Sequence, residues 1–238
     1  MKGLRDDMKN SVGRALKDAV KGGIADRPGR GSSMWTRTRE RIYSFLTFRP
    51  FSTRKDISRA IGVSDKTVAW HLDKLMKRGF VTRKGNRYYP TGLISSHDVS
   101  VLESFAAQGA KRLYVCILKN PGITIGEASV EADMSRSQVS ILSKKFHENG
   151  LATRVRNGRL SHLYPTDWTQ NKTEEYRKKA PGFIEHVTSL IKEEGTSFEG
   201  VRKEDIYTAI LKEGSSRYSL VISTNPISAI LRDAAPPV

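Results

Sequence analysis

The 238-residue sequence predicts an α+β protein that is mainly helical, in which one domain type is used twice and a small C-terminal α+β module follows. Three observations support this fold class. The sequence matches itself at an offset of 71 residues. Each matching copy carries three helical patterns and then the pattern of a β-hairpin. The composition changes after residue 168. We therefore expect regions at 1–34 (a helix and a basic linker), 35–97, 98–168 and 169–238.

The internal repeat follows from an ungapped alignment of residues 41–83 with residues 112–154. The same spacing is kept across three expected helices, which indicates one structural unit used twice. Identical residues lie where elements begin, pack or end; they include Pro50/Pro121, Thr53/Thr124, Ser64/Ser135, Val68/Val139 and Gly79/Gly150. Beyond a four-residue insertion in the second copy, Tyr89-Pro90-Thr91 matches Tyr164-Pro165-Thr166.

In the first copy, an amphipathic helix is expected to end near Pro50, with an inward stripe of Ile42, Phe45 and Leu46. Thr53 is a suitable N-cap for a second helix over 54–61. Gly62 allows a turn, and Ser64 is a suitable N-cap for a third helix that ends at Gly79. The buried stripe of this third helix is Val68, Leu72 and Leu75.

A β-hairpin is expected after the third helix, with strands over 80–82 and 87–89 and a turn over 84–86. The second copy follows the same course: Thr124 and Ser135 are its expected N-caps, and Gly150 ends its third helix. The buried stripe of that helix is Val139, Leu142 and Phe146. Helix, helix, turn, helix and hairpin is the order of a winged helix-turn-helix, so we expect two such domains in tandem.

A helix of this size fits the major groove of DNA, where base edges are distinguishable, and the N-terminal residues of the third helix contact those edges. In the first copy, the expected DNA-binding residues are Thr53, Arg54, Ser64, Lys66, Thr67, Trp70, His71 and Lys74. In the second copy, they are Arg136, Ser137, Gln138, Ser140, Ile141, Lys144 and Lys145. Arg136 and Gln138 are the strongest candidates, because arginine pairs with guanine and glutamine with adenine.

The two hairpins carry arginine and lysine without an acidic residue beside them in the sequence. These wing residues are Arg83, Lys84, Arg87, Arg154, Arg156 and Arg159. Such clusters suit phosphate contacts or insertion into a narrow minor groove. Because the two sets of helix residues differ, we expect the chain to prefer an asymmetric DNA site.

The segment from Ser64 to Leu75, followed by Gly79-Phe80-Val81, resembles the DNA-reading helix of ArsR/MarR-like winged-helix regulators, especially archaeal ones. The segment from Ser135 to Ser140, followed by Gly150-Leu151, is a looser version. This resemblance covers residues 36–168 and implies a prokaryotic transcription regulator. Two features depart from the family: the paired cysteines or acid and histidine clusters of ArsR-type metal sensors are missing, and two domains share one chain.

The formal net charge of +16 favours an anionic partner, and its distribution favours nucleic acid. Residues 35–97 hold 14 Lys and Arg against 4 Asp and Glu, whereas residues 169–238 hold 10 of each. We expect double-stranded DNA as the partner, with no membrane partner. A second copy of the chain, or transcription machinery or another protein bound through the C-terminal module, is a further expected partner.

The two ends of the chain have weaker patterns. Residues 4–21 form an amphipathic stripe, whose role as a dock, a dimer contact or a membrane contact stays open, and residues 22–34 are a basic linker. The C-terminal module is expected to hold helices near 183–194 and 205–212 and a strand over 218–222. Asn225 with Pro226 predicts the start of a last helix, and the module has an expected dimerisation or regulatory role.

No catalytic or cofactor motif is present, so we expect no enzyme activity, no cofactor and no metal. The sequence shows no apolar run of membrane length and no signal core, and the single Cys116 is expected in a core of a cytoplasmic, nucleoid-associated protein. Three functions stay open: a sequence-specific transcription regulator, a weakly specific architectural DNA protein, and a winged-helix module that binds RNA or protein.

Overall fold

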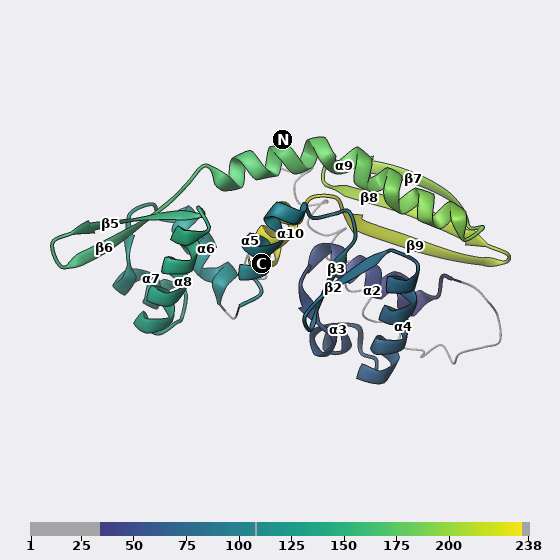
Figure 1. Ribbon diagram of the computed structural model, residues 1–238, viewed down its shortest axis with the longest axis horizontal. Helices are drawn as coiled ribbons and strands as arrows, with labels where there is room; N and C mark the ends of the chain where they lie inside the picture. The colour runs from purple at the N-terminus through teal and green to yellow at the C-terminus, as the bar shows by residue number, and fades with distance from the viewer. Residues whose placement is uncertain (1–33, 108, 235–238) are drawn as a thin grey trace, which may run out of the picture.

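The computed structural model describes residues 34–107 and 109–234, and this part of the chain forms three three-stranded antiparallel sheets. We call residues 35–97 the first unit, residues 98–168 the second unit and residues 169–234 the C-terminal module. Figure 1 shows the second unit at the left, the first unit at the lower right, and the long helix α9 (Trp168–Glu193) across the top. The expected helix over 4–21 and the linker over 22–33 lie outside the described residues.

The first unit has the predicted order of elements. It comprises α2 (Arg37–Phe48), β1 (Ser52–Thr53), α3 (Arg54–Ile61), α4 (Asp65–Lys77), β2 (Val81–Lys84) and β3 (Arg87–Pro90), with sheet order β1-β3-β2. The expected apolar stripes are its core, since Ile42, Leu46, Val68, Leu72 and Leu75 are all buried. The first unit is therefore three helices closed by a β-hairpin.

Predicted caps hold the ends of these helices. Thr53 and Asp56 form a reciprocal capping box, in which Asp56 Oδ2 accepts from the Thr53 backbone nitrogen at 2.9 Å. Ser64 Oγ accepts from the Thr67 backbone nitrogen at 3.1 Å. Gly79 has φ of 78°, and the next nitrogen, that of Phe80, donates to Leu75 O at 2.9 Å. Because Phe80 closes α4 in this way, the strand begins at Val81, one residue later than expected.

The second unit repeats this succession after a short lead-in. It comprises η1 (Ser96–Asp98), α5 (Val99–Ser104), α6 (Ala110–Lys119), β4 (Ile123–Thr124), α7 (Ile125–Glu131), α8 (Arg136–Glu148), β5 (Ala152–Asn157) and β6 (Leu160–Pro165), with sheet order β4-β6-β5. Thr124 and Ser135 cap α7 and α8 as predicted. At Gly150, φ is 70° and the nitrogen of Leu151 donates to Phe146 O at 2.8 Å, as at the end of α4.

Aromatic residues pack together in both cores, and one of them, a tyrosine, is at the same position in both copies. Trp35, Tyr43 and Phe80 meet edge to face in the first unit, with ring centroids 5.2 to 6.3 Å apart. Tyr114, which is equivalent to Tyr43 in the repeat, contacts Phe146 in the second unit at 5.4 Å. Cys116 is buried beside them, as expected, and burial raises the pKa of its thiol.

The C-terminal module joins α9 to a meander and a last helix. Its further elements are β7 (Ser197–Lys203), β8 (Ile206–Glu213), β9 (Ser216–Ser223) and α10 (Pro226–Ala234), with sheet order β7-β8-β9. The predicted helix over 205–212 is wrong, because this segment is β8. Tyr207, Ala209 and Leu211 are the buried apolar residues there, and a burial period of two residues is that of a strand. The predicted strand over 218–222 is confirmed within β9.

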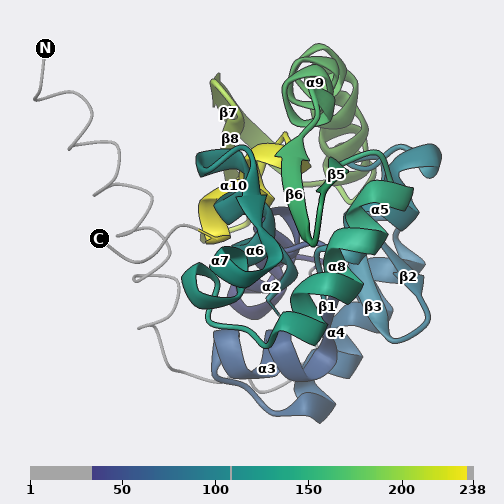
Figure 2. The ribbon, with the colours of Figure 1, turned by 90° about the vertical axis from the view of Figure 1, so that its left-hand side faces the viewer.

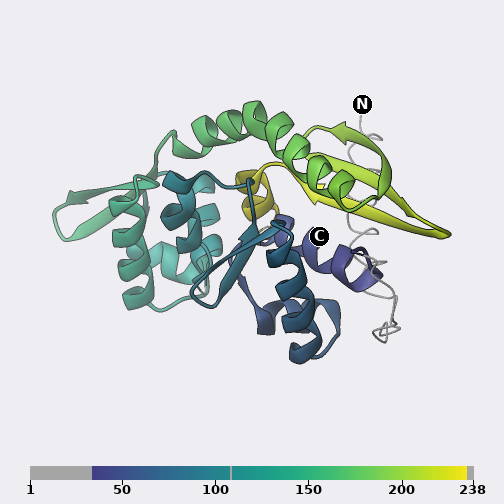
Figure 3. The same ribbon diagram turned by 45° about the vertical axis from the view of Figure 1, so that its right-hand side comes forward.

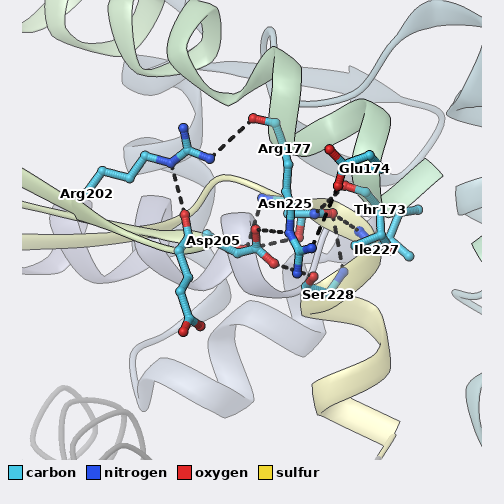
Figure 4. Close-up of polar contacts among 10 residues, drawn as sticks. Thr173, Glu174, Arg177, Arg202, Asp205, Asn225, Ile227 and Ser228 are labelled. Carbon is cyan, nitrogen blue, oxygen red and sulfur yellow. Dashed lines mark hydrogen bonds and ion pairs between the residues drawn. The ribbon is translucent and has the colours of Figure 1, made fainter. Parts of the chain in front are cut away.

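Helix α9 begins 15 residues earlier than the helix expected near 183–194, and it passes through Pro181. A proline has no N–H, so the carbonyl of Arg177, four residues earlier, lacks its helical donor. Arg202, at the end of β7, donates to that carbonyl from Nη2 at 3.3 Å (Figure 4). A side chain from the sheet therefore satisfies the group that the proline leaves without its helical bond.

Helix α10 holds the three parts of the molecule together. It packs against α2 of the first unit, α6 of the second unit and α9. Asn225 caps it as predicted: Asn225 Oδ1 accepts from the nitrogens of Ile227 at 3.1 Å and Ser228 at 3.4 Å. The same side chain donates from Nδ2 to Thr173 O of α9 at 3.1 Å (Figure 4). Through these contacts α10 sets how the two units are placed relative to one another.

Asp205, in the turn between β7 and β8, completes this junction. Asp205 Oδ2 accepts from Ser228 Oγ at 2.6 Å, and Asp205 Oδ1 lies 3.4 Å from Arg177 Nε (Figure 4). The Asp205 side chain is buried, so it joins α10 to α9 in a place with little water. The turn, the long helix and the last helix are therefore bonded to one another by side chains.

Candidate nucleic-acid interface

One face of α4 is open to solvent, and its composition suits a polyanion. Val68, Leu72 and Leu75 point into the core, which leaves Lys66, Trp70 and Lys74 on the exposed side. The Trp70 ring is 42% exposed. The ammonium of Lys74 lies 5.8 Å from its centroid and the guanidinium of Arg39 lies 5.3 Å from it. The predicted residues Lys66, Trp70 and Lys74 are therefore together on one surface.

His71 does not belong to this surface, which corrects its assignment as a DNA-binding residue. Its side chain is 3% exposed, and its Nδ1 accepts from Arg39 Nε at 3.2 Å. Burial, and then the charge of Arg39, lower the pKa of the imidazole to about 4. The helical position explains the error, since His71 is one turn from Val68 and Leu75 on the inward side. Sequence reasoning also missed Arg39, whose buried place beneath Trp70 depends on packing between α2 and α4.

Three residues that were predicted to contact DNA form hydrogen bonds at the N-termini of α3 and α4. The hydroxyl of Thr53 bonds Asp56 Oδ2 at 2.7 Å, and Ser64 Oγ lies 2.8 Å from Thr67 Oγ1. Arg54 is exposed and lies 3.6 Å from Asp65. Thr53, Ser64 and Thr67 therefore position α3 and α4, while their hydroxyls stay near the exposed ends of these helices.

The exposed face of α8 is equivalent to that of α4. Arg136, Ser137, Ile141 and Lys145 are exposed, and Ser140 is half-buried. Lys144 is also exposed and lies 3.9 Å from Glu148 one turn later. Arg136 stands at the first position of the helix, where the bases of a groove are most accessible.

Gln138, which the sequence assigned to base contact, forms a helix cap in the structure. Its Oε1 accepts from the Ser135 nitrogen at 3.0 Å and from Ser135 Oγ at 3.1 Å, which completes a capping box. A two-bond contact with adenine needs both the oxygen and the nitrogen of the amide. Gln138 must therefore leave the capping box before it can contact adenine in this way.

The basic side chains of the first wing make contacts within the protein that the sequence did not indicate. Lys84 Nζ lies 2.7 Å from Glu103 of α5, an acidic partner that comes from the next unit. Arg87 donates to Phe51 O at 2.9 Å, where the backbone has a φ of 63°, and Arg83 donates to Gly85 O within the turn. Part of the positive charge of this wing therefore holds the protein's own backbone and joins the two units.

The second wing is longer, and its arginines are exposed. Arg154 and Arg156 are on one face of the hairpin, because they are two residues apart on β5, and Arg156 pairs with Ser161 across the strands. Arg154 Nη2 donates to Ser161 Oγ at 3.1 Å. Arg154, Arg156, Arg159 and Ser161 together line a shallow, open hollow. Three guanidinium groups around one hollow are suited to phosphate oxygens.

Helices α4 and α8 both lie below α9 in Figure 2. In Figure 3 the second wing extends from the second unit at the end of the molecule. Within residues 34–107 and 109–234, no cluster of His, Cys, Asp and Glu is suited to a metal ion. In the same ranges no helix is long and apolar enough to cross a membrane.

Comparison with known proteins adds one family match. A family model described as winged helix-turn-helix DNA-binding matches residues 36–82, from the N-cap of α2 into β2. No curated protein matches the chain. The crystal structure of the DIP2311 protein from Corynebacterium diphtheriae is similar over 54% of this chain and 26% of that chain, at 13% identity and a TM-score of 0.23. This chain thus spans about a quarter of that protein. The family match identifies a DNA-binding fold in the first unit.

Proposed function

We propose that this protein is a transcription regulator that binds a specific sequence of double-stranded DNA with α4 and α8 in successive segments of the major groove. The observation that carries the proposal is the match of residues 36–82 to a DNA-binding family, joined to the repetition of the same elements in the second unit. In this account both units are winged helix-turn-helix domains, and no enzymatic reaction is involved.

The two helices supply different base contacts. Lys66 in α4 and Arg136 in α8 each stand in the first turn of the helix, where donors reach guanine O6 and N7. Their sequence surroundings differ, so the two segments of the DNA site differ as well. Since the units share one chain, a single molecule covers both segments, and the preferred site is asymmetric.

The second wing supplies contacts to the DNA backbone. Arg154, Arg156 and Arg159 are exposed around one hollow, and phosphate contacts fix the register of a protein on the duplex. Six such contacts over the whole surface would weaken binding by roughly a thousandfold between about 50 and 200 mM salt. Salt dependence is therefore a necessary property of the complex and does not by itself establish sequence preference.

A weakly specific architectural DNA protein is the second candidate. The observation that favours it is the engagement of Gln138, Thr67 and Ser64 in helix caps, which leaves fewer polar groups for base contacts. A module that binds structured RNA or protein is a third candidate, and it would leave the duplex unbound.

Selection from a random pool of duplexes near physiological salt separates these functions. Enrichment of one asymmetric motif, with weaker preference in Arg136→Ala, supports the regulator. The matched control is Lys178→Ala, which removes an exposed cation from α9, outside both units, and should leave the motif unchanged. Steep salt dependence without enrichment would indicate the architectural protein, and absence of duplex binding would refute both DNA-binding functions.

A further inference from the structure

Each of the helices α4 and α8 presents one large apolar side chain to solvent at the same position. Trp70 is the sixth residue of α4 and Ile141 is the sixth residue of α8, and they are equivalent in the internal repeat. Trp70 is 42% exposed and Ile141 is 69% exposed. Successive residues of a helix are about 100° apart, so each side chain lies about 200° from the buried valine two residues before it. Both therefore point almost directly away from the core.

The other exposed large apolar residues are not exposed in both copies: Tyr164 is 40% exposed, but its equivalent Tyr89 is half-buried. Val130 on α7 is 82% exposed, but the equivalent position of the first unit is Arg59. Val201 and Ile210 are on the C-terminal sheet, which has no counterpart in the repeat. Single exposed apolar residues are ordinary on protein surfaces. The same exposure at one equivalent position of both units indicates a shared use.

The surroundings of the two side chains indicate what they would contact. Lys74 and Arg39 hold cations over the Trp70 ring, which fixes the ring at the surface and places positive charge around it. Ile141 has the small residues Ser137 and Ser140 on its own helix, so a ligand can approach it closely. An exposed apolar side chain with positive charges around it suits a ligand that carries an apolar group on a negatively charged backbone.

We propose that Trp70 and Ile141 each contact the C5-methyl group of a thymine, one in each segment of the major groove. This inference rests on the proposed function and adds a chemical property to its DNA site. Thymine is the one standard base that presents a methyl group in the major groove. Trp70 and Ile141 lie one helical turn after Lys66 and Ser137, on the face that the proposed function places in that groove. RNA carries uracil, which lacks the methyl, so the same contacts favour DNA.

The test replaces thymine by deoxyuridine, one position at a time, in the duplex that the selection enriches. This change removes one methyl and keeps the base pair. Burial of one methyl corresponds to about a fourfold change in affinity. We expect the dissociation constant to rise by about fourfold at one or more thymines in each segment. Trp70→Ala should remove the difference between thymine and deoxyuridine in one segment only, and Ile141→Ala in the other only.

The matched control is Val201→Ala, which shortens an exposed apolar side chain on β7 and should leave every thymine effect unchanged. A wild-type protein that binds all the deoxyuridine duplexes as tightly as the thymine duplex would overturn the inference and leave the proposed function intact. Equal loss of affinity for both duplexes in Trp70→Ala and Ile141→Ala would also overturn it. Failure to bind any duplex would refute the proposed function itself.

Discussion

Asn225 is the residue through which the junction of the molecule is most directly tested. Its side chain is fully buried, and it makes two bonds to the start of α10 and one bond to Thr173 O of α9. Loss of an N-cap costs about 1 kcal/mol of unfolding free energy. Loss of a buried hydrogen bond costs about 1 kcal/mol more. Asn225→Ala should therefore lower the unfolding free energy by about 2 kcal/mol.

A second variant separates the two contributions. Asn225→Ser keeps an oxygen that can cap α10 but is too short to reach Thr173 O, so it should cost about 1 kcal/mol. The matched control is Asn171→Ala on the exposed surface of α9, which should change stability by less than about 0.5 kcal/mol.

Urea unfolding, with coincident fluorescence and circular dichroism transitions to establish two-state behaviour, measures these differences. For a chain of this size, the Asn225→Ala variant should melt about 4 to 8 °C lower than the wild type. An Asn225→Ala variant no less stable than Asn171→Ala, or an Asn225→Ser variant as unstable as Asn225→Ala, would contradict a cap that also bonds α9.

Three further predictions concern the two units. His71 has a folded pKa of about 4, below its usual value, so its contribution to stability is complete above pH 6.5 and is lost as the pH falls toward 4. Urea unfolding at several pH values should show that the difference in unfolding free energy between His71→Gln and the wild type shrinks across this window. Burial raises the pKa of Glu40 to about 7, but Glu40 is present in both proteins, so its titration does not affect this difference. Glu103→Ala should release Lys84 and strengthen the binding of any duplex, and the slope of log affinity against log salt concentration should become steeper by about 1. An unchanged slope would show that the ion pair does not restrict Lys84. Replacing both Arg154 and Arg156 by Ala should make that slope shallower by about 2 while the preferred sequence stays the same; a changed preference would place these arginines against bases.

Local patterns predicted much of the fold. Thr53, Ser64, Thr124 and Ser135 are the caps that the sequence indicated, because capping depends on residues within one turn of each other. Asn225 was predicted for the same reason. The segment over 205–212 was assigned to a helix because its apolar residues fit both periods over a short length, and only pairing with β7 and β9 decides between them.

The parts of the candidate interface that the sequence did not predict depend on contacts between distant segments. Glu103 reaches Lys84 from another unit, and Arg39 reaches His71 from another helix. The use of Gln138 in a capping box has a local signal, because a serine three residues before a glutamine is the pattern of such a box. That pattern competes with base contact for the same amide, and the sequence does not rank the two uses.

A map of the guanines that each helix contacts distinguishes a protein with two DNA-binding helices from a protein with one. The wild type, Lys66→Ala and Arg136→Ala would each be measured by methylation interference at guanine N7 on the enriched duplex. We expect two separate major-groove segments in the wild type, with Lys66→Ala losing contacts in one and Arg136→Ala losing contacts in the other. A single segment of interfering guanines, or the same loss in both variants, would contradict a protein that uses two helices on two parts of one site.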